Sequence, residues 1–558
     1  MKYLKRSIAL LLASVLCLSV LAGCAEQEEP QGFSLTVSVG SQPVSLDPIY
    51  AEQPGDQTIL THLYENLMTV SVDSTTGKQT VINGMAKSVS QEPQHDGSVV
   101  YTFKLRSAQW SDGRHVTADD FVYAWQRLAD PASGSPYAAL LSVVSGYQEA
   151  RSTGDMSLLQ VTAKNDSTLT VTLDGRYDWF LTEVCTSPAT MPLRQDVIGT
   201  LKEQNKTDKG YDPWWSDPTM LVTNGPMTVS AWEPEEQLTA ERAPQYNGGQ
   251  NGPGTLTFRF SDTAEEAWEL YREKEVDAVW PLPEKQLQKL SEDEHWKPSP
   301  ELGTTAVLVN YSQDELADPL VRQAMNLVID RTVLAQAAGM MAQPAEGLVP
   351  PGVPENDEGD FRTIGGPLLD NEPGSYAEKC DQALALLVES GHGDGDSLGE
   401  MEYLYVDRKN NGAVAEALCQ MWNDILGMRI TARGVSELEL WDAMRRGDFQ
   451  LAGVDLTYPG NDAECVLMQW TSDSQDNLVN YENSAYDTLM SIIATASSDM
   501  ARMGCLHDAE KLLLSDDVVI PLYTQESGWM LRNGYSGILR EPRGWFSFTH
   551  VYQTSGTP

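Results

Sequence analysis

The side chains that most often carry catalysis are scattered along this 558-residue chain rather than grouped. The metal-binding pattern HExxH, the nucleophile motif GxSxG and the phosphate loop ending in Gly-Lys-Ser/Thr are all absent from the sequence. Carboxylate pairs carry little information in a chain with 80 Asp and Glu residues. The sequence therefore predicts no catalytic residues, and we expect that the protein is not an enzyme. The seven histidines are His62, His95, His115, His295, His392, His507 and His550.

One short segment is rich in possible metal ligands. Residues 391–396 read Gly-His-Gly-Asp-Gly-Asp. A calcium loop that began at Asp394 would need Glu at its twelfth position, where Tyr405 stands. A helix that ends at a glycine, followed by a turn, accounts for this composition better. We therefore expect no metal site and no cofactor.

The cysteines give no sign of a metal or redox centre. No CxxC pair exists, so zinc-ribbon and thioredoxin-like sites are excluded. An odd number beyond the N-terminal region leaves at least one thiol free, and we expect most of them to be small core residues. The five are Cys185, Cys380, Cys419, Cys465 and Cys505.

Cys24 has the sequence context of a lipid attachment site. Residues 2–6 carry three positive charges, and residues 8–21 form an uncharged apolar stretch, shorter than the ~20 residues of a membrane span. The stretch ends in Leu-Ala-Gly-Cys, which resembles the bacterial lipobox, where the cysteine is diacylated and becomes the new N-terminus. Two acyl chains would anchor an extracytoplasmic protein to the cell membrane. The alternative is an ordinary signal peptide cleaved nearby, with Cys24 incidental.

The net charge of −42 limits the possible partners. Nucleic acids and anionic membrane surfaces both need a basic face, so neither is an expected partner. The acid excess keeps the protein soluble, and the alternative is a preference for cationic ligands. Residues 25–32 are polar and acidic, as in a tether, and no later segment offers ~18 uncharged apolar residues that would span a membrane.

The rest of the sequence predicts the helices and strands that must position a binding site. Residues 101–106 alternate apolar and polar side chains, as a half-buried strand does. Thr117 can cap a helix whose first turn carries Asp119 and Asp120, and Pro131 ends that helix. Helices that alternate with strands indicate α/β layers.

Two later helices are predicted from their caps. Asp318-Pro319 is a cap followed by a first-turn proline, which opens a helix over Leu320 to Ala337. Ser375 and Glu378 have the spacing of a capping box for a helix that ends at Gly391.

The most specific motif of the chain is YTFKLRSAQWSDGRHVTADDFVYAWQRLADPASGSPYAALL, residues 101–141. It closely resembles the signature region of solute-binding protein family 5: Leu-Arg, then Trp-Ser-Asp-Gly, Thr-Ala-Asp-Asp-Phe and Trp-x-Arg. The continuation Ala-Asp-Pro and Ser-Pro-Tyr-Ala is similar to the oligopeptide-binding branch. Further landmarks follow in family order and extend the resemblance over the whole mature chain. They are Ser45-Leu46-Asp47-Pro48, Leu63-Tyr64-Glu65-Asn66-Leu67, Asn224-Gly225-Pro226, Val276-Asp277, Val321-Arg322-Gln323-Ala324, Leu426-Gly427 and Ile520-Pro521-Leu522-Tyr523.

The resemblance implies an α/β, periplasmic-binding-protein-like fold, in which a hinge joins two lobes and an extra domain is inserted. The ligand is trapped by contacts made only when the lobes close, and is then handed to an ABC permease driven by an ATPase. We expect a monomer. The implied domains are a signal peptide over 1–24, a tether over 25–32, lobe I over 33–68, 206–300 and 526–558, inserted domain II over 69–205, and lobe III over 301–525.

The resemblance also implies where the ligand binds. Peptide binders pair the ligand backbone with protein segments as a strand would, which gives affinity with little dependence on ligand sequence. One segment follows Leu-Asp-Pro, for which a plain surface loop is the alternative, and the other precedes a tyrosine. The implied ligand-binding residues are Glu52, Gln53, Trp441, Arg445, Gly453, Val454, Asp455, Thr457 and Tyr458.

Several positions depart from the oligopeptide branch. That branch has Trp at Val454 and, at Thr457, an Asp that holds the peptide ammonium group. Thr cannot neutralise an ammonium, and an unpaired buried charge is costly. Either Asp455 or Asp462 has taken over this role, or a free peptide N-terminus is not the recognised feature.

Two further features bear on the ligand. Gly303 to Val307 lacks the aromatic residues of the branch, and no cysteine pair joins this segment to Gly453, as in some relatives. Arg445 could meet a ligand carboxylate, although a solvated basic helix end before Gly447 is the alternative.

Three functions remain open from the sequence. The first is an oligopeptide-binding lipoprotein of an importer. The second is a family member retuned to an oligosaccharide, a modified peptide or a metal chelate, which Thr457 and the missing aromatics favour. The third is a peptide-sensing receptor or surface chaperone without transport.

Overall fold

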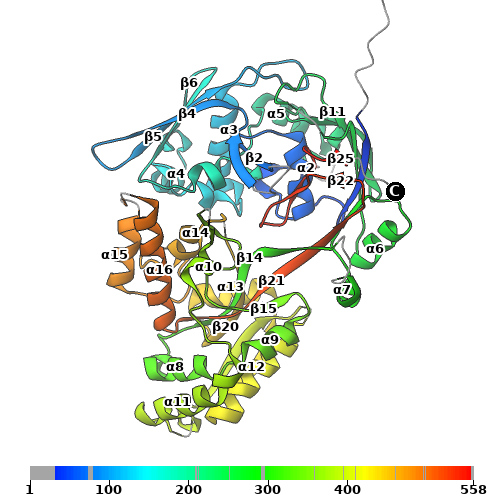
Figure 1. Ribbon diagram of the computed structural model, residues 1–558. Helices are drawn as coiled ribbons and strands as arrows, with labels where there is room; N and C mark the ends of the chain where they lie inside the picture. The colour runs from blue at the N-terminus through cyan, green and yellow to red at the C-terminus, as the bar shows by residue number, and fades with distance from the viewer. Residues whose placement is uncertain are drawn as a thin grey trace, which may run out of the picture.

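Two long strands connect the two lobes of the chain (Figure 1). We call residues 32–298 and 527–554 the upper lobe and residues 303–524 the lower lobe. The predicted signal peptide and Cys24 lie outside the described residues. The computed structural model describes residues 32–554 except 73–78, 208–209, 212, 250–251, 291–295, 357, 394, 409, 459, 475, 494–495 and 497.

One large mixed sheet runs through both lobes. Its strands β14 and β21 pair antiparallel along most of their length, and their register shifts between Pro300 and Thr304, where the chain passes from one lobe to the other. In the described part of the chain the sheet has eleven strands. In sheet order they are β10 (Met227–Glu233), β11 (Gln237–Arg242), β12 (Thr255–Arg259), β1 (Ser34–Val39), β13 (Ala278–Trp280), β21 (Val519–Leu531), β14 (Trp296–Val309), β20 (Leu451–Thr457), β18 (Glu400–Val406) and β19 (Arg429–Val435), with β15 (Ala342–Pro344) beside β21.

The upper lobe also carries a small antiparallel sheet and several helices. Its helix α3 begins after Thr117, whose backbone N–H donates to Asp120 Oδ2 at 2.8 Å in a capping box, so this predicted helix start is confirmed. The predicted strand over 101–106 is also confirmed, as β5. The small sheet contains β4 (Ala86–Pro93), β5 (Val99–Leu105), β7 (Thr168–Leu173) and β6 (Val161–Asn165), and the helices are α2 (Pro54–Leu63), α3 (Ala118–Ala129), α4 (Tyr147–Thr153), α5 (Gln195–Gln204), α6 (Ala264–Arg272) and α7 (Glu284–Leu290).

Short hairpins complete the strands of both lobes. They are β2 (Met68–Val72) with β3 (Gln79–Asn83), β8 (Lys206–Thr207) with β9 (Gly210–Tyr211), β16 (Pro354–Asn356) with β17 (Gly359–Asp360), β22 (Tyr535–Ser536) with β25 (Tyr552–Gln553), and β23 (Leu539–Arg540) with β24 (Phe546–Ser547).

Helices cover the sheet of the lower lobe, and two predictions about them are wrong. The expected single helix over Leu320 to Ala337 is two helices, because the Asp330 carboxylate accepts from Thr332 N–H at 3.0 Å and starts a new one. Ser375 makes no capping box, since its hydroxyl donates to the carbonyl of Glu372 at 2.9 Å instead. The helices are α8 (Pro319–Leu327), α9 (Arg331–Ala338), α10 (Phe361–Gly365), α11 (Tyr376–Glu389), α12 (Asn411–Leu426), α13 (Glu437–Arg446), α14 (Ala463–Leu467), α15 (Ser484–Ile493) and α16 (Asp499–Ser515).

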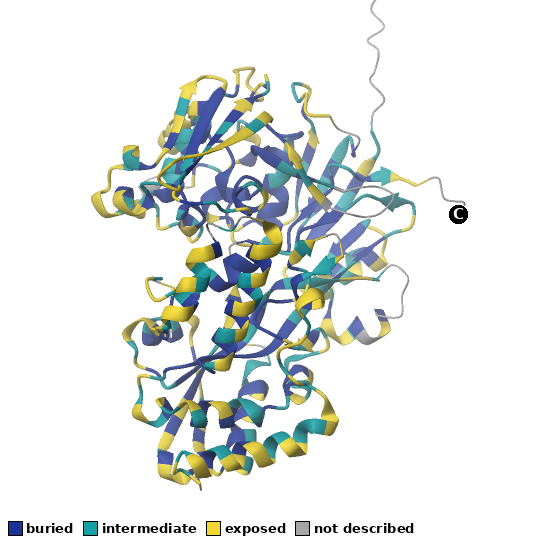
Figure 2. Cartoon of the chain, turned by 60° about the vertical axis from the view of Figure 1, so that its left-hand side comes forward, coloured by how far each residue is buried: buried dark blue, intermediate teal, exposed yellow. Residues whose placement is uncertain are grey.

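Each lobe has its own hydrophobic core. The largest cluster fills the upper lobe and includes Trp110, Trp125 and Phe258, none of which is exposed. Two clusters fill the lower lobe around its part of the sheet. In Figure 2 the strands are mostly buried, whereas the outer faces of the helices are exposed. The lobes thus have largely separate cores and share the strand pair β14 and β21, while Cys465 and Met468 of the lower lobe pack into the upper cluster.

Candidate functional site

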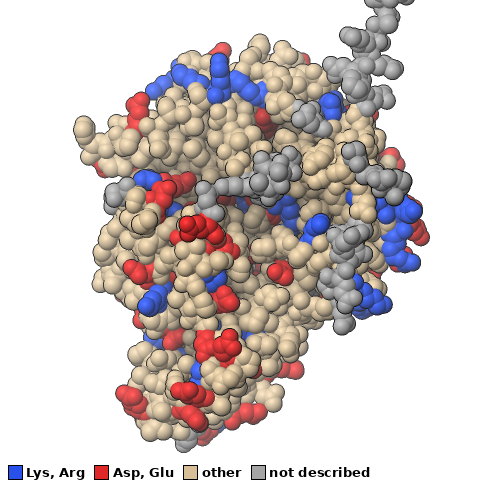
Figure 3. Space-filling model, in the orientation of Figure 1, with Lys and Arg blue, Asp and Glu red and all other residues tan. Residues whose placement is uncertain are grey.

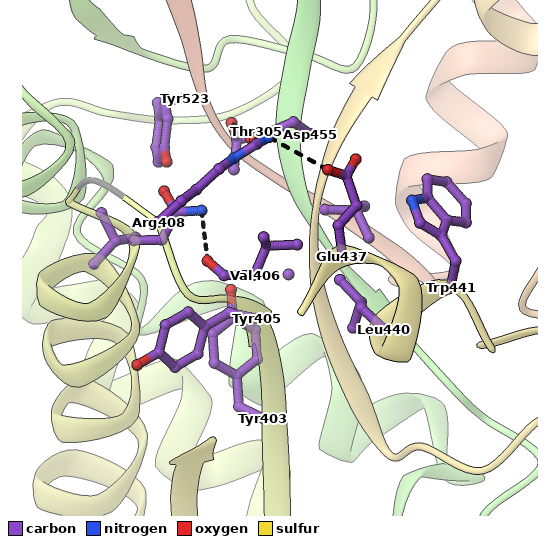
Figure 4. A pocket seen from close by; sticks show the side chains of 14 residues that line it. Thr305, Tyr403, Tyr405, Val406, Arg408, Glu437, Leu440, Trp441, Asp455 and Tyr523 are labelled. Carbon is purple, nitrogen blue, oxygen red and sulfur yellow. Dashed lines mark hydrogen bonds and ion pairs between the residues drawn. The ribbon is translucent and has the colours of Figure 1, made fainter. Parts of the chain in front are cut away.

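A pocket lies at the carboxyl ends of β18 and β20 in the lower lobe (Figure 4). These strands are parallel neighbours, with Tyr405 opposite Gly453, so their ends meet at the edge of the sheet where ligands of α/β proteins bind. The pocket holds about 510 Å³ of space, part of which is open to solvent. Its lining residues are Thr305, Tyr403, Tyr405, Val406, Arg408, Asn411, Val414, Glu437, Leu440, Trp441, Gly453, Val454, Asp455 and Tyr523.

The structure brings four of the predicted ligand-binding residues into this pocket: Trp441, Gly453, Val454 and Asp455. Along β20, Asp455 and Thr457 are exposed, whereas Val454 is buried. This alternation is that of a strand with one face on the core and one face free. The free face therefore carries Gly453, Asp455 and Thr457, and Tyr458 belongs to the core below it.

Gly453 is required by the pocket itself. A Cβ atom at this position would lie 2.0 Å from the hydroxyl oxygen of Tyr403. Tyr403 is 3% exposed and stands in the neighbouring strand, so it has little room to move. Only glycine lets the tyrosine hydroxyl reach the surface of β20.

Asp455 is the centre of the polar contacts in the pocket. Its Oδ1 accepts from the hydroxyl of Thr305 at 2.6 Å, and its Oδ2 accepts from Arg408 Nη2 at 2.8 Å. The hydrogen bond from Asp455 holds the pKa of Arg408 above its usual value, so this guanidinium stays charged. Glu437, on the first turn of α13, lies 3.7 Å from Arg408 Nη1. Arg408 thus bridges two carboxylates across the pocket.

Aromatic rings form much of the remaining wall. Tyr403 and Tyr405 stack with ring centroids 6.3 Å apart, and Trp441 extends from α13 beside Glu437. Burial raises the pKa of Tyr523 to about 12, so its hydroxyl stays protonated and can donate a hydrogen bond. Such rings offer an apolar face and a polar edge to a ligand.

Glu52 and Gln53 lie in the other lobe from the pocket. They follow the short 3₁₀ turn Pro48–Tyr50 and precede α2, and both are exposed. The loop is fixed by the carbonyl of Ala51, which accepts from Gln57 Nε2 at 3.0 Å. The pocket is lined by lower-lobe residues alone, so these two residues would meet a ligand only from across the space between the lobes.

The other possible ammonium anchor, Asp462, is already paired. Its Oδ1 caps α14 by accepting from Glu464 N–H at 2.8 Å, and it also accepts from Arg502 Nη2 at 2.6 Å. Arg445 lies outside the pocket lining, on an exposed part of α13, 3.7 Å from Asp442. Neither residue therefore offers a free charge to the pocket.

The lobes touch each other next to this site. Glu183 of the upper lobe is buried, and its Oε2 accepts from the Asn461 backbone N–H at 2.8 Å. Within the upper lobe, Arg543 lies 3.6 Å from the same carboxylate and helps to hold it at the contact. Nearer the rim, Arg176 Nη2 is 3.2 Å from Asp499 of α16. We call these contacts the lobe contact.

A second pocket lies wholly within the upper lobe. It holds about 800 Å³ of space, part of it solvent, and is lined by residues of 61–83, 186–191, 226–249 and 539–550. Its carboxylate, Glu65, is paired with Arg106 and accepts from the hydroxyl of Tyr246 at 3.1 Å. None of the predicted ligand-binding residues lines it.

Sequence reasoning missed Arg408, Glu437 and Tyr405. One signal was available, because Arg408 follows the strand over Glu400–Val406 directly, where parallel strands place their functional residues. Glu437 carried no signal of its own in so acidic a chain.

The described part of the chain contains no helix with the length and apolar character of a membrane span.

Comparison with known proteins assigns the family. Residues 80–477 match the model of "Bacterial extracellular solute-binding proteins, family 5 Middle". The chain is 28% identical over 525 residues to the probable deoxycholate-binding periplasmic protein YgiS of Escherichia coli, with 92% of each chain covered. It is 26% identical over 518 residues to the periplasmic oligopeptide-binding protein OppA of Salmonella typhimurium, with 89% of each covered.

A solved structure agrees with this assignment. The complex of Haemophilus influenzae OppA with RPPGFSPFR superposes with a TM-score of 0.69 at 25% identity, covering 94% of this chain and 99% of that one. The predicted two-lobe α/β fold of the periplasmic-binding-protein type is thereby confirmed. The matched model spans more than half of the sequence, over the same stretch that carries the signature motif. The chain belongs to the bacterial extracellular solute-binding proteins, family 5.

Proposed function

We propose that this protein captures oligopeptides between its two lobes and delivers them to the permease of an ABC transporter. The observation that carries the proposal is the end of β20: its ladder with β18 stops at Gly453, whereas its ladder with β14 continues to Thr457, so the last residues of β20 form a sheet edge beside the pocket that Gly453 and Asp455 line. An extended peptide can pair with such a strand. The relative OppA of Haemophilus influenzae is described as a complex with a peptide.

Closure of the lobes would supply the remaining contacts. The lobe contact places Glu183 against Asn461, and Glu52 and Gln53 are exposed residues of the upper lobe that a ligand held by the lower lobe could meet on closure. A hinge at the register shift between Pro300 and Thr304 would let the lobes open and close about the strand pair. The chain binds and releases its ligand in this scheme and breaks no bond.

The finer features of the protein are part of the same proposal. Cys24 carries the lipid that holds the protein on the outer side of the cell membrane, and residues 25–32 are its tether. Lobe I comprises 33–68, 206–300 and 526–558, domain II 69–205, and lobe III 301–525. The protein acts as a monomer.

A second candidate is a non-peptide solute, such as an oligosaccharide, a metal chelate or an amphipathic acid. Arg408 and Arg502 already occupy Asp455 and Asp462, so a peptide ammonium would have to displace a guanidinium. The relative YgiS is named for binding deoxycholate. A free peptide N-terminus is then not the recognised group.

Thermal unfolding separates these functions. The purified protein is heated with a tetrapeptide pool, the same pool after N-acetylation, an oligosaccharide mixture and deoxycholate. A ligand at 100 times its Kd should add ~2.7 kcal/mol to the free energy of unfolding. We expect both peptide pools to raise the melting temperature, because Asp455 and Asp462, the two carboxylates considered as anchors of the peptide ammonium, are each already paired with an arginine. A shift with sugars or deoxycholate alone would overturn the peptide proposal.

A further inference from the structure

The pocket carries more negative than positive charge. Among the described residues that line it are two carboxylates, Asp455 and Glu437, and one guanidinium, Arg408. The sum is negative, as is the surface around it: on the face in Figure 3, acidic side chains gather over the lower lobe, while basic ones lie along the top of the upper lobe. An entering anion is therefore repelled overall, and an entering cation is attracted.

The two carboxylates differ in how firmly they are held. Asp455 is engaged on both oxygens, by Thr305 at 2.6 Å and by Arg408 at 2.8 Å. Glu437 lies 3.7 Å from the guanidinium, beyond hydrogen-bond length, and its side chain is 61% exposed. Glu437 is thus the carboxylate that an entering group can reach without breaking a short contact.

The walls next to Glu437 suit a cation on an apolar stem. Trp441 stands one turn further along α13, beside Glu437, and packs in the same core cluster as Leu440 and Val406, which also line the pocket. An indole face attracts an ammonium or guanidinium group, and apolar walls accept the methylene chain of lysine or arginine. Arg408 is already shared between two acids and has little to offer a ligand carboxylate.

We propose that this pocket receives a basic side chain of the ligand, with Glu437 as its ion-pair partner and Trp441, Leu440 and Val406 as its walls. The inference rests on the proposed function and narrows it to peptides that carry lysine or arginine. Arg408 acts as an internal counter-ion that keeps Asp455 in place while Glu437 meets the ligand.

Calorimetric titration with three tetrapeptide pools tests the inference. The three pools share the same set of tetrapeptides except at one position of each peptide. That position is Lys in the first pool, Gln in the second and Glu in the third, and it is placed at each of the four sites in different members of a pool. The wild-type protein should bind the Lys pool about fivefold more tightly than the Gln pool, as expected for one partly exposed ion pair. Glu437→Gln should abolish this preference, measured as the ratio of the Kd values of the Lys and Gln pools in the same protein.

A matched control lies on the same helix. Glu439 is exposed, pairs with Arg433 at 3.4 Å and does not line the pocket, so Glu439→Gln should keep the preference for Lys. Arg408→Gln should increase the preference, because it removes a competing cation. If all three pools bind equally, or if the Lys preference survives Glu437→Gln, the site for a basic side chain is wrong and the peptide function still stands. If none of the three pools binds, the peptide function is wrong as well.

Discussion

Replacing Glu464 by Gln should remove a pH dependence of stability that the protein carries near neutrality. Glu464 lies on α14, is 4% exposed, and its Oε2 is 2.7 Å from Arg502 Nη2. Asp462 contacts the same guanidinium at 2.6 Å, and Asp178 of the upper lobe lies 3.9 Å away. Arg502 thus contacts three carboxylates, of which Asp178 is also paired with Arg176 at 2.8 Å. Burial, only partly offset by Arg502, raises the pKa of Glu464 from 4.5 to about 7.

The sign follows from the direction of this pKa shift. The folded protein holds the Glu464 proton more tightly than the unfolded chain, so the group stabilises the fold at low pH. This stabilisation is lost as the pH rises through about 7. With an unfolded pKa of 4.5, the step from pH 8 to pH 5 should add about 2–3 kcal/mol to the free energy of unfolding.

Urea unfolding of both proteins at pH 8 and pH 5 measures the effect. The wild type should gain about 2–3 kcal/mol more than Glu464→Gln over this interval, because glutamine does not titrate. Other groups titrate in both proteins, so the difference between the proteins isolates Glu464. Glu439→Gln, on an exposed face of α13, is the control and should follow the wild type. Parallel pH profiles for wild type and Glu464→Gln would refute the reasoning.

Three further predictions follow from single side chains. Gly453→Val should abolish binding of the peptide pools in calorimetry, because the valine side chain would collide with Tyr403. The circular dichroism spectrum should stay native. Retained affinity would show that the ligand does not bind at β20. Glu510→Ala should lower the free energy of unfolding in urea by about 3–5 kcal/mol, because the buried Arg362 and the backbone N–H groups of Leu348 and Val349 lose their partner. A loss below ~1 kcal/mol would contradict this. His62, buried and hydrogen-bonded to the Thr58 carbonyl and the Phe548 N–H, should show no ring titration by NMR between pH 8 and 5, because burial lowers its pKa to about 4.

The sequence predicted correctly those helices and strands that are determined by residues close to one another in the chain. The helix after Thr117 begins where its cap and Asp120 require, and the strand over 101–106 alternates as its burial demands. The helix predicted over Leu320 to Ala337 failed because Asp330 caps a second helix and the buried Arg331 donates to the carbonyl of Pro521 at 2.7 Å. That contact spans distant parts of the chain, which periodicity does not reveal.

The candidate site was predicted in part for the same reason. Gly453 and Asp455 could be found from the family pattern around one strand, and Trp441 from the helix before it. Arg408 and Glu437 could not, because their role depends on parallel pairing between β18 and β20, which brings separate segments together. Asp455 was considered as an ammonium anchor, but its partner Arg408 stands 47 residues earlier in the chain.

The three polar clusters near the gap between the lobes have one property in common. Arg408 serves Asp455 and Glu437, and Arg543 serves Glu183 and Glu541. Arg502 serves Asp462, Glu464 and Asp178. Carboxylates outnumber guanidinium groups in each cluster, also when Arg176, which pairs with Asp178, is counted together with Arg502. Excess negative charge of this kind is costly where it is buried.

Something positive must therefore accompany closure. At the lobe contact the available cation is a proton, since burial also raises the pKa of Glu183 above its ordinary value. At the pocket it is the basic side chain of a ligand. When the lobes close without a ligand, the carboxylates repel one another. A cationic ligand reduces this repulsion, so it favours the closed state by its charge as well as by its contacts.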